Sequence, residues 1–343
     1  MGTRSLLIKP GCIGHLADAL TGVPKLNEIL FATDPVVDKL YGGTVMAQLE
    51  QLGHVRKVYV DYNTLTIAMD IAESMIADSV GCLVAMGGGK VLDVCKYAAF
   101  ITKTPLMSIP TTVSNDGIAS PVAALKQKDS RPRSLACTPP AILVMDPEII
   151  LAGPAQLVKA GIGDTLSKFT ALDDWTFACD KGKDTMNGYA YMMAQTSLDV
   201  LLHSRHSGLT PDFIDDLAHS LVLSGISMEF AGSSRPVSGS EHLFSHALDF
   251  LGEKTNLHGL QVALGTVAVT LLMDEDPEPI VSVLKKFDIQ VAPSALGISE
   301  DLFVRAMQQA PGMRKSRWTR LHEADLNSAR LSELYRRVEQ LLA

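Results

Sequence analysis

The sequence predicts an α/β protein in two parts, a parallel β-sheet with crossover helices followed by a helical region. Up to about residue 150, short apolar runs alternate with stretches whose apolar residues recur at helical spacing. After Pro154 only the helical spacing continues. A glycine triplet also separates one apolar run from the helical stretch that follows it. We therefore expect a boundary near Leu151–Pro154, with an α/β domain over residues 1–152 and a helical domain over residues 153–343.

Six strands are predicted in the first domain, each a short apolar run ended by turn-forming residues. They are Ser5–Ile8, Glu28–Thr33, Val55–Val60, Gly81–Met86, Leu106–Ile109 and Ala141–Met145. The fourth run is almost wholly apolar, which is typical of a parallel strand buried on both faces. Helices are expected between them over residues 35–52, where Pro35 suits the first turn, over residues 64–76, and after the glycine triplet.

Seven helices are predicted in the second domain, and no strand. They are Leu157–Asp174, Ala190–His203, Pro211–Phe230, Glu241–Phe250, Leu257–Met273, Pro279–Phe287 and Ser328–Leu342. Ser240 is expected to cap the helix that begins at Glu241, with the acid in the first turn, where the helix dipole favours it.

Composition limits the classes of function. The net charge of −8 without a basic run argues against nucleic acid as a partner. Five cysteines, an odd number without a C-x-x-C pair, suit a reducing compartment. The start of the chain does not resemble a signal peptide, and no apolar run reaches the roughly 20 residues that span a bilayer. We therefore expect a cytoplasmic protein without a membrane span.

Three histidines, His242, His246 and His258, lie within 17 residues of one another. The first two are four apart, so on a helix they share a face. Two neutral imidazoles from different elements and one carboxylate make a metal site with an open position, and Asp164 is the candidate carboxylate. The alternative is ordinary core or surface histidines. A His-Glu-x-x-His protease signature is absent, because Glu241 precedes His242.

The glycine triplet follows the fourth strand, as Gly87-Gly88-Gly89-Lys90, and opens a helix. A strand, a glycine turn and a helix place backbone N–H groups against a phosphate. The motif is neither G-x-G-x-x-G nor a P-loop, and a tight structural turn is the alternative. The polar loop of residues 110–121 follows the fifth strand, where α/β proteins bind ligands, although it could also be a simple connection.

Together these motifs resemble metal-dependent polyol dehydrogenases. The ordered set is Gly-Gly-Gly-Lys-x-x-Asp-x-x-Lys, Pro-Thr-Thr-x-Ser-x-Asp, Gly-x-Gly-Asp-x-Leu-Ser-Lys, His-x-x-x-His-Ala-Leu and His-Gly. That superfamily includes glycerol dehydrogenase, iron-type alcohol dehydrogenases and 3-dehydroquinate synthase. Residues 116–121 and 234–248 are similar to stretches of the sn-glycerol-1-phosphate dehydrogenase family. The resemblance covers roughly residues 1–270 and implies a dehydroquinate synthase-like fold whose first domain is Rossmann-like.

The resemblance implies roles position by position. Asp164, His242 and His258 match the metal ligands, while Asp116, Asp164 and His246 match substrate-binding positions. Asp116 and His246 are also the candidate catalytic residues. Asp34, at the end of the second strand, stands where an acid would hold the adenosine ribose. The positions that match cofactor contacts are Gly87, Gly88, Gly89, Lys90, Val91, Leu92, Asp93, Thr111, Thr112, Val113, Ser114 and Ser120.

The implied reaction is hydride transfer between a secondary alcohol and NAD(P), with one divalent metal ion as Lewis acid. Zinc is the expected ion, and nickel and iron stay open. The expected substrate pair is sn-glycerol-1-phosphate and dihydroxyacetone phosphate. Lys168, four residues after Asp164, and Arg235 are candidates to bind the phosphate.

One departure from the family pattern concerns the substrate. Asn115 stands where the family usually has His, which leaves the exact substrate open. The alternatives are a glycerol or alcohol dehydrogenase for an unphosphorylated polyol, a dehydroquinate synthase-like cyclase, and a non-catalytic nucleotide-binding protein. A homo-oligomer is expected.

Overall fold

The computed structural model describes residues 3–24, 26–127, 132–252 and 256–343. The chain divides into two compact units. Unit 1 comprises Met1–Pro154 with Thr210–Ala218, and unit 2 comprises Ala155–Leu209 with His219–Ala343.

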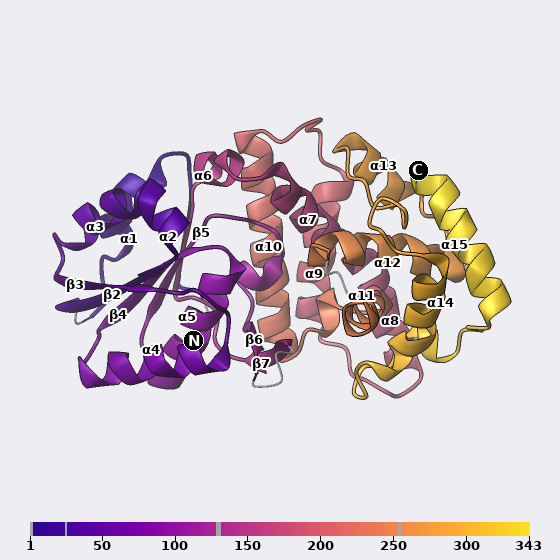
Figure 1. The fold of residues 1–343 in the computed structure, drawn as a ribbon, viewed down its shortest axis with the longest axis horizontal. Coiled ribbons are helices and arrows are strands. Elements are labelled where there is room, and N and C mark those ends of the chain that lie inside the picture. Colours follow the sequence, from indigo (N-terminus) through magenta and orange to yellow (C-terminus); the bar gives the residue numbers. More distant parts are fainter. Residues whose placement is uncertain (1–2, 25, 128–131, 253–255) are drawn as a thin grey trace. The chain divides into compact units, whose positions relative to one another are not determined.

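Unit 1 is built on a parallel sheet of six strands, as the sequence predicts (Figure 1). The strands are β1 (Ser5–Ile8), β2 (Glu28–Thr33), β3 (His54–Tyr59), β4 (Cys82–Gly87), β5 (Leu106–Pro110) and β8 (Ile142–Met145). They lie in the order β1-β8-β5-β4-β2-β3, and every neighbouring pair is parallel. Because the neighbouring strands β2, β4 and β5 are parallel, their carboxyl ends lie at the same edge of the sheet.

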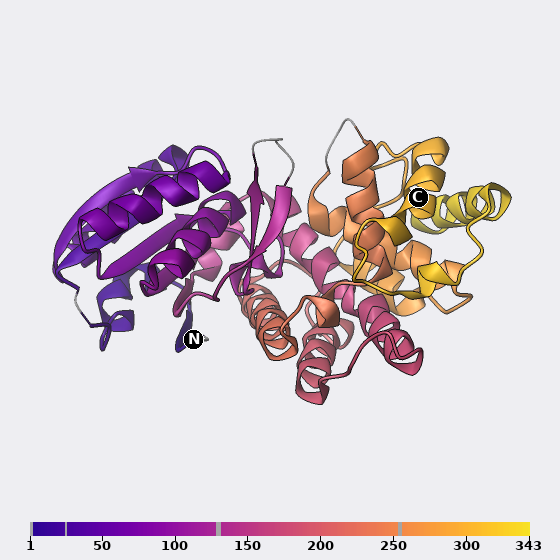
Figure 2. The same ribbon diagram turned by 90° about the horizontal axis from the view of Figure 1, so that it is seen from below.

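Helices cover both faces of this sheet (Figures 1 and 2). On one face lie η1 (Cys12–His15), α1 (Leu16–Ala19) and α3 (Gly43–Leu49), whose apolar side chains form a core with those of β2, β4 and β5. On the other face lie α4 (Leu65–Ala77) and α5 (Gly89–Thr102), which Figure 2 shows in front of the strands. The short helix α6 (Pro147–Ala152) follows β8.

The prediction of a single helix over residues 35–52 is wrong in the middle of that range, where the α-helix is interrupted. It begins as α2 (Pro35–Val37), passes through a π-helical turn, η2 (Asp38–Gly42), and continues as α3. The side chain of Asp38 accepts hydrogen bonds from Lys57 (3.0 Å) and Tyr59 (2.6 Å) of β3. That carboxylate also occupies the space beside Gly42, where a Cβ atom would overlap it. The tertiary contact with β3 thus accompanies the widened turn.

An antiparallel hairpin, β6 (Val122–Lys126) and β7 (Pro132–Ala136), was not predicted (Figure 2). Buried Lys96 of α5 anchors it: Nζ donates to the carbonyl of Gly117 (2.6 Å) and to that of Val122, and pairs with Asp93 (3.0 Å). The carboxylate of Asp93 also accepts the N–H of Ala124 (3.2 Å). The hairpin therefore depends on a buried ion pair in a helix, which its own sequence does not reveal.

All the described helices of unit 2 pack without a strand among them, in agreement with the predicted helical domain. They are α7 (Ala155–Leu166), α8 (Lys168–Asp180), α9 (Gly188–Leu202), α10 (Pro211–Ala231, whose first residues belong to unit 1), α11 (Ser240–Leu251), α12 (His258–Leu272), α13 (Glu278–Lys286), α14 (Glu300–Gln309) and α15 (Ser328–Leu342). Short turns η4 (Arg235–Val237), η5 (Ala310–Gly312) and η6 (Arg320–His322) join some of them. Helix α12 is central, because its residues after His258 are all buried.

Two predictions for unit 2 need correction, and one helix was missed. The helix expected over residues 157–174 is interrupted at Ser167, whose hydroxyl donates to the carbonyl of Asp164 (2.6 Å). Helix α14 was not predicted. Gly239, rather than Ser240, is the N-cap of α11, because Asp174 of α8 accepts the Ser240 N–H (2.6 Å) and supplies the capping carboxylate from outside the helix.

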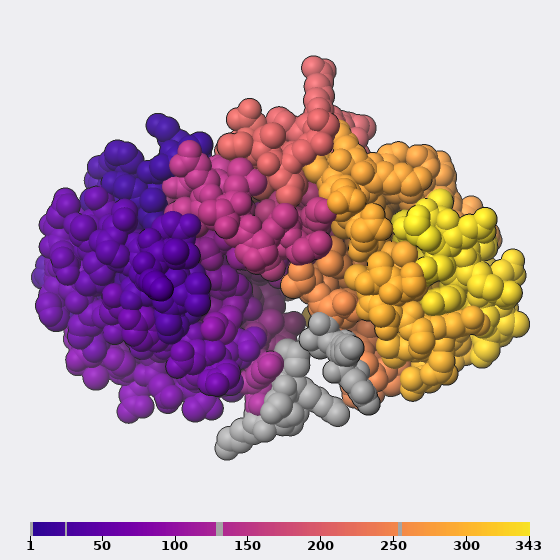
Figure 3. Space-filling model, turned by 45° about the horizontal axis from the view of Figure 1, so that its top comes forward, coloured from indigo at the N-terminus to yellow at the C-terminus, as the bar shows by residue number. Residues whose placement is uncertain are grey.

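The C-terminal helix α15 lies on the surface of unit 2, as its yellow atoms in Figure 3 show. It buries Leu331, Leu334 and Val338 and leaves most of its polar side chains on the solvent side. Among the described helices, none is both long and apolar enough to cross a membrane.

Candidate functional site

Three helices of unit 2 bring Asp164, His242 and His258 together. The carboxylate of Asp164 on α7 lies 3.6 Å from Nε2 of His242 on α11 and 3.8 Å from Nε2 of His258 at the start of α12. The candidate ligand atoms of the three residues all lie within 4.8 Å of one another. His242 and His258 follow Asp164 by nearly 80 or more positions in the sequence, yet they lie beside it in the structure, as the motif pattern predicts.

This donor set fits a divalent metal ion. Two ligands of a tetrahedral ion at 2.0–2.1 Å lie about 3.3 Å from each other. The observed separations from Asp164 are therefore within a few tenths of an ångström of that geometry. The Asp164 side chain is 2% exposed and that of His258 is 35% exposed, so the group is accessible from the side of His258. Two imidazoles and a carboxylate with an accessible side could hold a metal ion and leave it room for a further ligand.

Close packing of α7 on α12 places Asp164 beside His258. A Cβ on Gly163 would overlap the carbonyl oxygen of Gly259, and a Cβ on Gly259 would overlap that of Ala160. Only glycine at both positions lets the two backbones approach so closely. Gly163 and Gly259 therefore have a packing role that positions the candidate ligands Asp164 and His258 next to them.

The charges of the site favour a cation. Burial would raise the pKa of Asp164, but the bond from His242 and the charge of Lys168 outweigh it and lower that pKa. Burial would likewise lower the pKa of His242, yet its bonds to Asp164 and Glu241 raise the pKa to about 9. In the metal-free protein, the carboxylates of Asp164 and Glu241 therefore keep a proton on His242.

Each histidine of the group has a further partner at its other ring nitrogen. Nδ1 of His242 lies 2.8 Å from Oε1 of Glu241, which is fully buried. Nδ1 of His258 lies 3.3 Å from the hydroxyl of Ser245. The sequence reading missed both partners, because it assigned Glu241 only to the helix dipole. The signal that could have found Glu241 is an acid adjacent to a candidate ligand at the buried start of a helix.

His246 lies near the group, one helical turn after His242. Its ring centroid is 6.4 Å from that of His242 and 6.1 Å from that of His258. Burial, followed by the charges of the other two histidines, lowers the pKa of His246 to about 3. The same causes, burial and then His242, lower the pKa of His258 to about 4. Both rings are neutral near pH 7, and each has one nitrogen that can accept a hydrogen bond.

The two cations expected to bind a phosphate have intramolecular partners. Lys168 is fully buried, and its Nζ donates to the carbonyl of Asp164 (3.0 Å). Arg235 is 3% exposed, donates to the carbonyls of Asp174 (3.1 Å) and Trp318, and pairs with Asp184 (2.9 Å). Through these contacts Arg235 links separate segments of unit 2, and they do not favour the expected contact of Arg235 with substrate.

In unit 1, the expected cofactor residues gather at the carboxyl edge of β2, β4 and β5. Asp34 caps α2 through Oδ1, and its Oδ2 lies 3.5 Å from the position of a Cβ on Gly87. The N–H of Thr111 donates to the carbonyl of Gly87 (3.0 Å). Gly88 precedes the first turn of α5 without a side-chain cap, and a Cβ there would lie 3.9 Å from Oγ1 of Thr112. Three loops thus surround the start of α5, as expected for a dinucleotide site.

Other residues of these motifs lie deeper. Val91, Leu92 and Val113 are buried, and Asp93 is held by Lys96 and the N–H of Ala124. The hydroxyl of Ser120 donates to the carbonyl of Val122 (3.2 Å). These side chains support the loops, and for them the structure indicates an indirect role.

Asn115, the departure from the family pattern, has a local structural role. Its Oδ1 accepts the N–H of Gly117 (2.9 Å) and caps the short helix η3 (Asp116–Ile118). Asparagine is well suited to such a turn. Asp116, a candidate substrate residue, is the first residue of η3.

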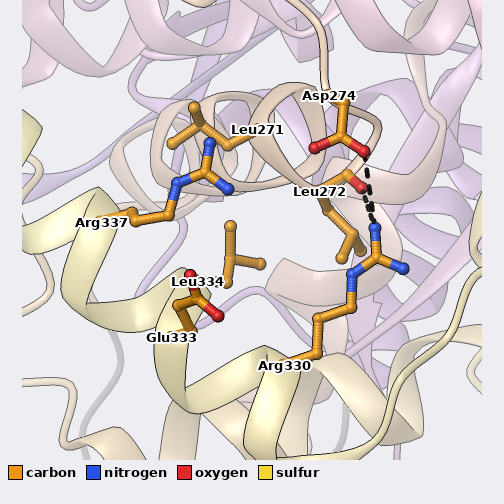
Figure 4. Close-up of a pocket in the computed structure, with 7 residues that line it drawn as sticks. All are labelled: Leu271, Leu272, Asp274, Arg330, Glu333, Leu334 and Arg337. Carbon is orange, nitrogen blue, oxygen red and sulfur yellow. Dashed lines mark hydrogen bonds and ion pairs between the residues drawn. The ribbon is translucent and has the colours of Figure 1, made fainter.

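A separate hollow of about 90 Å³ lies where α12 ends against α15 (Figure 4). Arg330 donates there to the carbonyl of Leu272 (2.9 Å) and lies 3.8 Å from Asp274. These contacts satisfy the end of α12, and the hollow is too small for a nucleotide.

Several known proteins are similar to this chain in sequence or in fold. A family model described as iron-containing alcohol dehydrogenase matches residues 7–154. The glycerol-1-phosphate dehydrogenase [NAD(P)+] of Hyperthermus butylicus is 34% identical over 94% of this chain and 93% of its own length. The enzyme of the same name from Methanosphaera stadtmanae is 33% identical, with 92% and 91% covered. The glycerol dehydrogenase structure from Schizosaccharomyces pombe matches with a TM-score of 0.82 at 18% identity, covering 99% of this chain and 90% of that chain, and it confirms the expected fold.

Proposed function

The chain belongs to the glycerol-1-phosphate dehydrogenase [NAD(P)+] family, and on that premise we propose that it interconverts sn-glycerol-1-phosphate and dihydroxyacetone phosphate. NAD(P) is the hydride carrier. Similarity over more than nine-tenths of both chains is the observation that carries the proposal, and the convergence of Asp164, His242 and His258 supports it.

We propose that Asp164, His242 and His258 hold one divalent ion, and that zinc is this ion. When bound, such an ion polarises the ketone and lowers the pKa of the alcohol. The separations of the three donor groups and the negative charge of Asp164 support this assignment.

His246 and Asp116 are the proposed catalytic residues. His246 is neutral near pH 7, because its pKa is lowered to about 3, so its ring can accept a hydrogen bond from a substrate hydroxyl. Asp116, at the start of η3, is proposed to bind a second hydroxyl.

The α/β domain of residues 1–152 is proposed to bind the dinucleotide, and residues 153–343 are proposed as the metal and substrate domain. The first-turn N–H groups of α5, at Gly89 and Lys90, would face the pyrophosphate. Asp34 would hold the adenosine ribose, supported by its place beside Gly87.

The test measures NADH and NADPH oxidation by dihydroxyacetone phosphate and by dihydroxyacetone, with and without a chelator. We expect turnover of the phosphorylated ketone, loss of turnover in the chelator, and recovery with zinc. His258→Ala should abolish activity, whereas His15→Ala, a change at an exposed histidine, should leave it unchanged. Absence of turnover with either ketone by a metal-loaded protein would overturn the proposal.

A glycerol-type dehydrogenase is the second candidate. The internal partners of Lys168 and Arg235 favour it, because neither is arranged as a free phosphate clamp. The same assay distinguishes the two, since this candidate requires faster turnover of dihydroxyacetone than of its phosphate.

The cytoplasm is the proposed location, and a homo-oligomer the proposed assembly. The described cysteines are all free thiols, which suits a reducing compartment. Light scattering of the purified protein tests the assembly.

A further inference from the structure

In both His242 and His258, the ring nitrogen Nδ1 is linked by hydrogen bonds to a carboxylate. At His242 the link is direct, to Glu241. At His258 it runs through a chain of hydrogen bonds, from Ser245 to Gln261 and then to Asp249.

Glu241 is held in one orientation by three donors. Its Oε1 accepts the N–H of Gly239 (2.6 Å) and lies 2.8 Å from Nδ1 of His242, while Oε2 accepts the hydroxyl of Thr170 (2.6 Å). An ionised carboxylate can only accept, so the hydrogen between it and the ring belongs to Nδ1. The nitrogen that faces Asp164 is then Nε2, which presents a lone pair whenever a metal ion displaces its proton.

The second chain fixes the direction of its hydrogen bonds from its far end. The amide Nε2 of Gln261 donates to Asp249 (3.1 Å), and the amide oxygen therefore accepts the hydroxyl of Ser245 (2.8 Å). The oxygen of Ser245 is left to accept the Nδ1 hydrogen of His258 (3.3 Å). Nε2 of His258 again faces Asp164.

We propose that Glu241, and the chain of Ser245, Gln261 and Asp249, are positioning groups that hold both imidazoles with hydrogen on Nδ1 and Nε2 free for a metal ion. The inference rests on the proposed metal-binding role of Asp164, His242 and His258. It adds that a carboxylate outside the ligand set orients each imidazole. Glu241 acts on His242 directly, and Asp249 acts on His258 through the neutral side chains of Gln261 and Ser245.

The test measures zinc affinity of the full-length, metal-free protein by competition with a coloured chelator. Glu241→Gln keeps the shape, because the amide can accept from the ring and donate to Thr170, and it removes the charge alone. Glu241→Ala removes both. We expect affinity to fall about 10-fold in the first variant and about 100-fold in the second, the range seen for groups that orient metal ligands.

Asp173→Asn is the matched control. It removes the same charge from the same unit, but its carboxylate lies near Arg320 and bonds to neither imidazole of the group. We expect it to change affinity by less than about twofold, because a partly exposed charge is screened. Ser245→Ala tests the second chain, and we expect about a 10-fold loss.

Folding of each variant is checked by circular dichroism, and the absorption bands of the Co²⁺-loaded protein report the ligand geometry. If Glu241→Ala does not fold, Glu241→Gln and Ser245→Ala still decide. Zinc affinity and Co²⁺ spectra like those of the unaltered protein would overturn the inference. Failure of the unaltered protein to bind zinc would instead overturn the proposed metal site.

Discussion

His242, His246 and His258 differ in proton affinity although they lie close together. Burial and the neighbouring imidazoles lower the pKa of His246 to about 3, and burial with the charge of His242 lowers that of His258 to about 4. The carboxylates of Asp164 and Glu241 overcome burial at His242 and raise its pKa to about 9. One protonated ring and two neutral rings are thus expected in the metal-free protein at pH 7.

The combined contribution of these three histidines to the stability of the metal-free protein should be greatest near pH 6.5, the ordinary pKa of histidine. His246 and His258 stabilise the fold above that value, and this contribution is lost as the pH falls towards 4, because the unfolded chain then binds more protons. The contribution of His242 is complete below pH 6.5 and is lost as the pH rises through 9. Melting temperatures between pH 4 and 9.5 in a chelator measure both sides. His246→Gln should flatten the acid side, and equal slopes in both proteins would contradict this assignment.

At the scale of single residues, the sequence indicates which candidate metal ligands come together, but it does not indicate the residues that bond to them. Asp164, His242 and His258 are recognisable because their chemistry is specific and their motifs are ordered. Glu241 resembles any acid in the first turn of a helix, and only its burial and its bond to His242 show otherwise. Arg235 shows the reverse case, because a cation in a suspected active-site loop turns out to bind Asp184 and backbone carbonyls.

At the scale of elements, the contact of α7 with α12 determines whether the candidate ligands meet. Gly259→Ala should destabilise unit 2 by about 1–3 kcal/mol, because the new methyl group overlaps the Ala160 carbonyl and forces the helices apart. Zinc affinity should fall as well, since Asp164 and His258 separate. Urea unfolding and chelator competition measure the two effects.

Gly188→Ala is the control for that substitution. Gly188 also lies in the first turn of a helix in unit 2, but nothing lies within 4 Å of its Cβ position. It should leave zinc affinity unchanged. If Gly259→Ala were as harmless as Gly188→Ala, close packing would not be what positions the group.

The turn before α5 offers a second contrast between glycines. A Cβ on Gly87 would lie 2.7 Å from Val91, whereas nothing lies within 4 Å of a Cβ on Gly89. Gly87→Ala should therefore lower the melting temperature, and Gly89→Ala should leave it unchanged. If the turn binds a pyrophosphate, Gly89→Ala should still weaken NADH binding about 10-fold or more, because the methyl group projects from the first turn. Fluorescence titration with NADH checks this, and unchanged affinity would argue against the assignment of the turn.

Most elements that form from their own periodicity were predicted, with α14 as an exception, and those that depend on distant side chains were not. The buried strand β4 and the amphipathic helix α15 match their predicted positions within a residue. The hairpin of β6 and β7 needs Lys96 and Asp93 from α5, and the π-helical turn accompanies contacts of Asp38 with Lys57 and Tyr59. These are tertiary effects that override local propensity.

At the scale of the whole molecule, the two candidate sites belong to different units. The proposed metal ligands and the groups that orient them all lie in unit 2. The glycine turn, Asp34 and the loop after β5 all lie in unit 1. Each ligand should therefore stabilise mainly the unit that holds its binding residues.

Hydrogen exchange of the native protein tests this division. A ligand at 100 times its dissociation constant stabilises the bound state by about 2.7 kcal/mol, which slows exchange through unfolding of that state about 100-fold. Zinc should slow the amides of α7, α11 and α12 most, and NADH those of β4, α5 and β5. Gly89→Ala should reduce the protection by NADH and preserve that by zinc, while His258→Ala should reduce the protection by zinc and preserve that by NADH. Zinc protection centred on β4 and α5 would contradict the placement of the metal site in unit 2, because ligands on three packed helices must restrain those helices first.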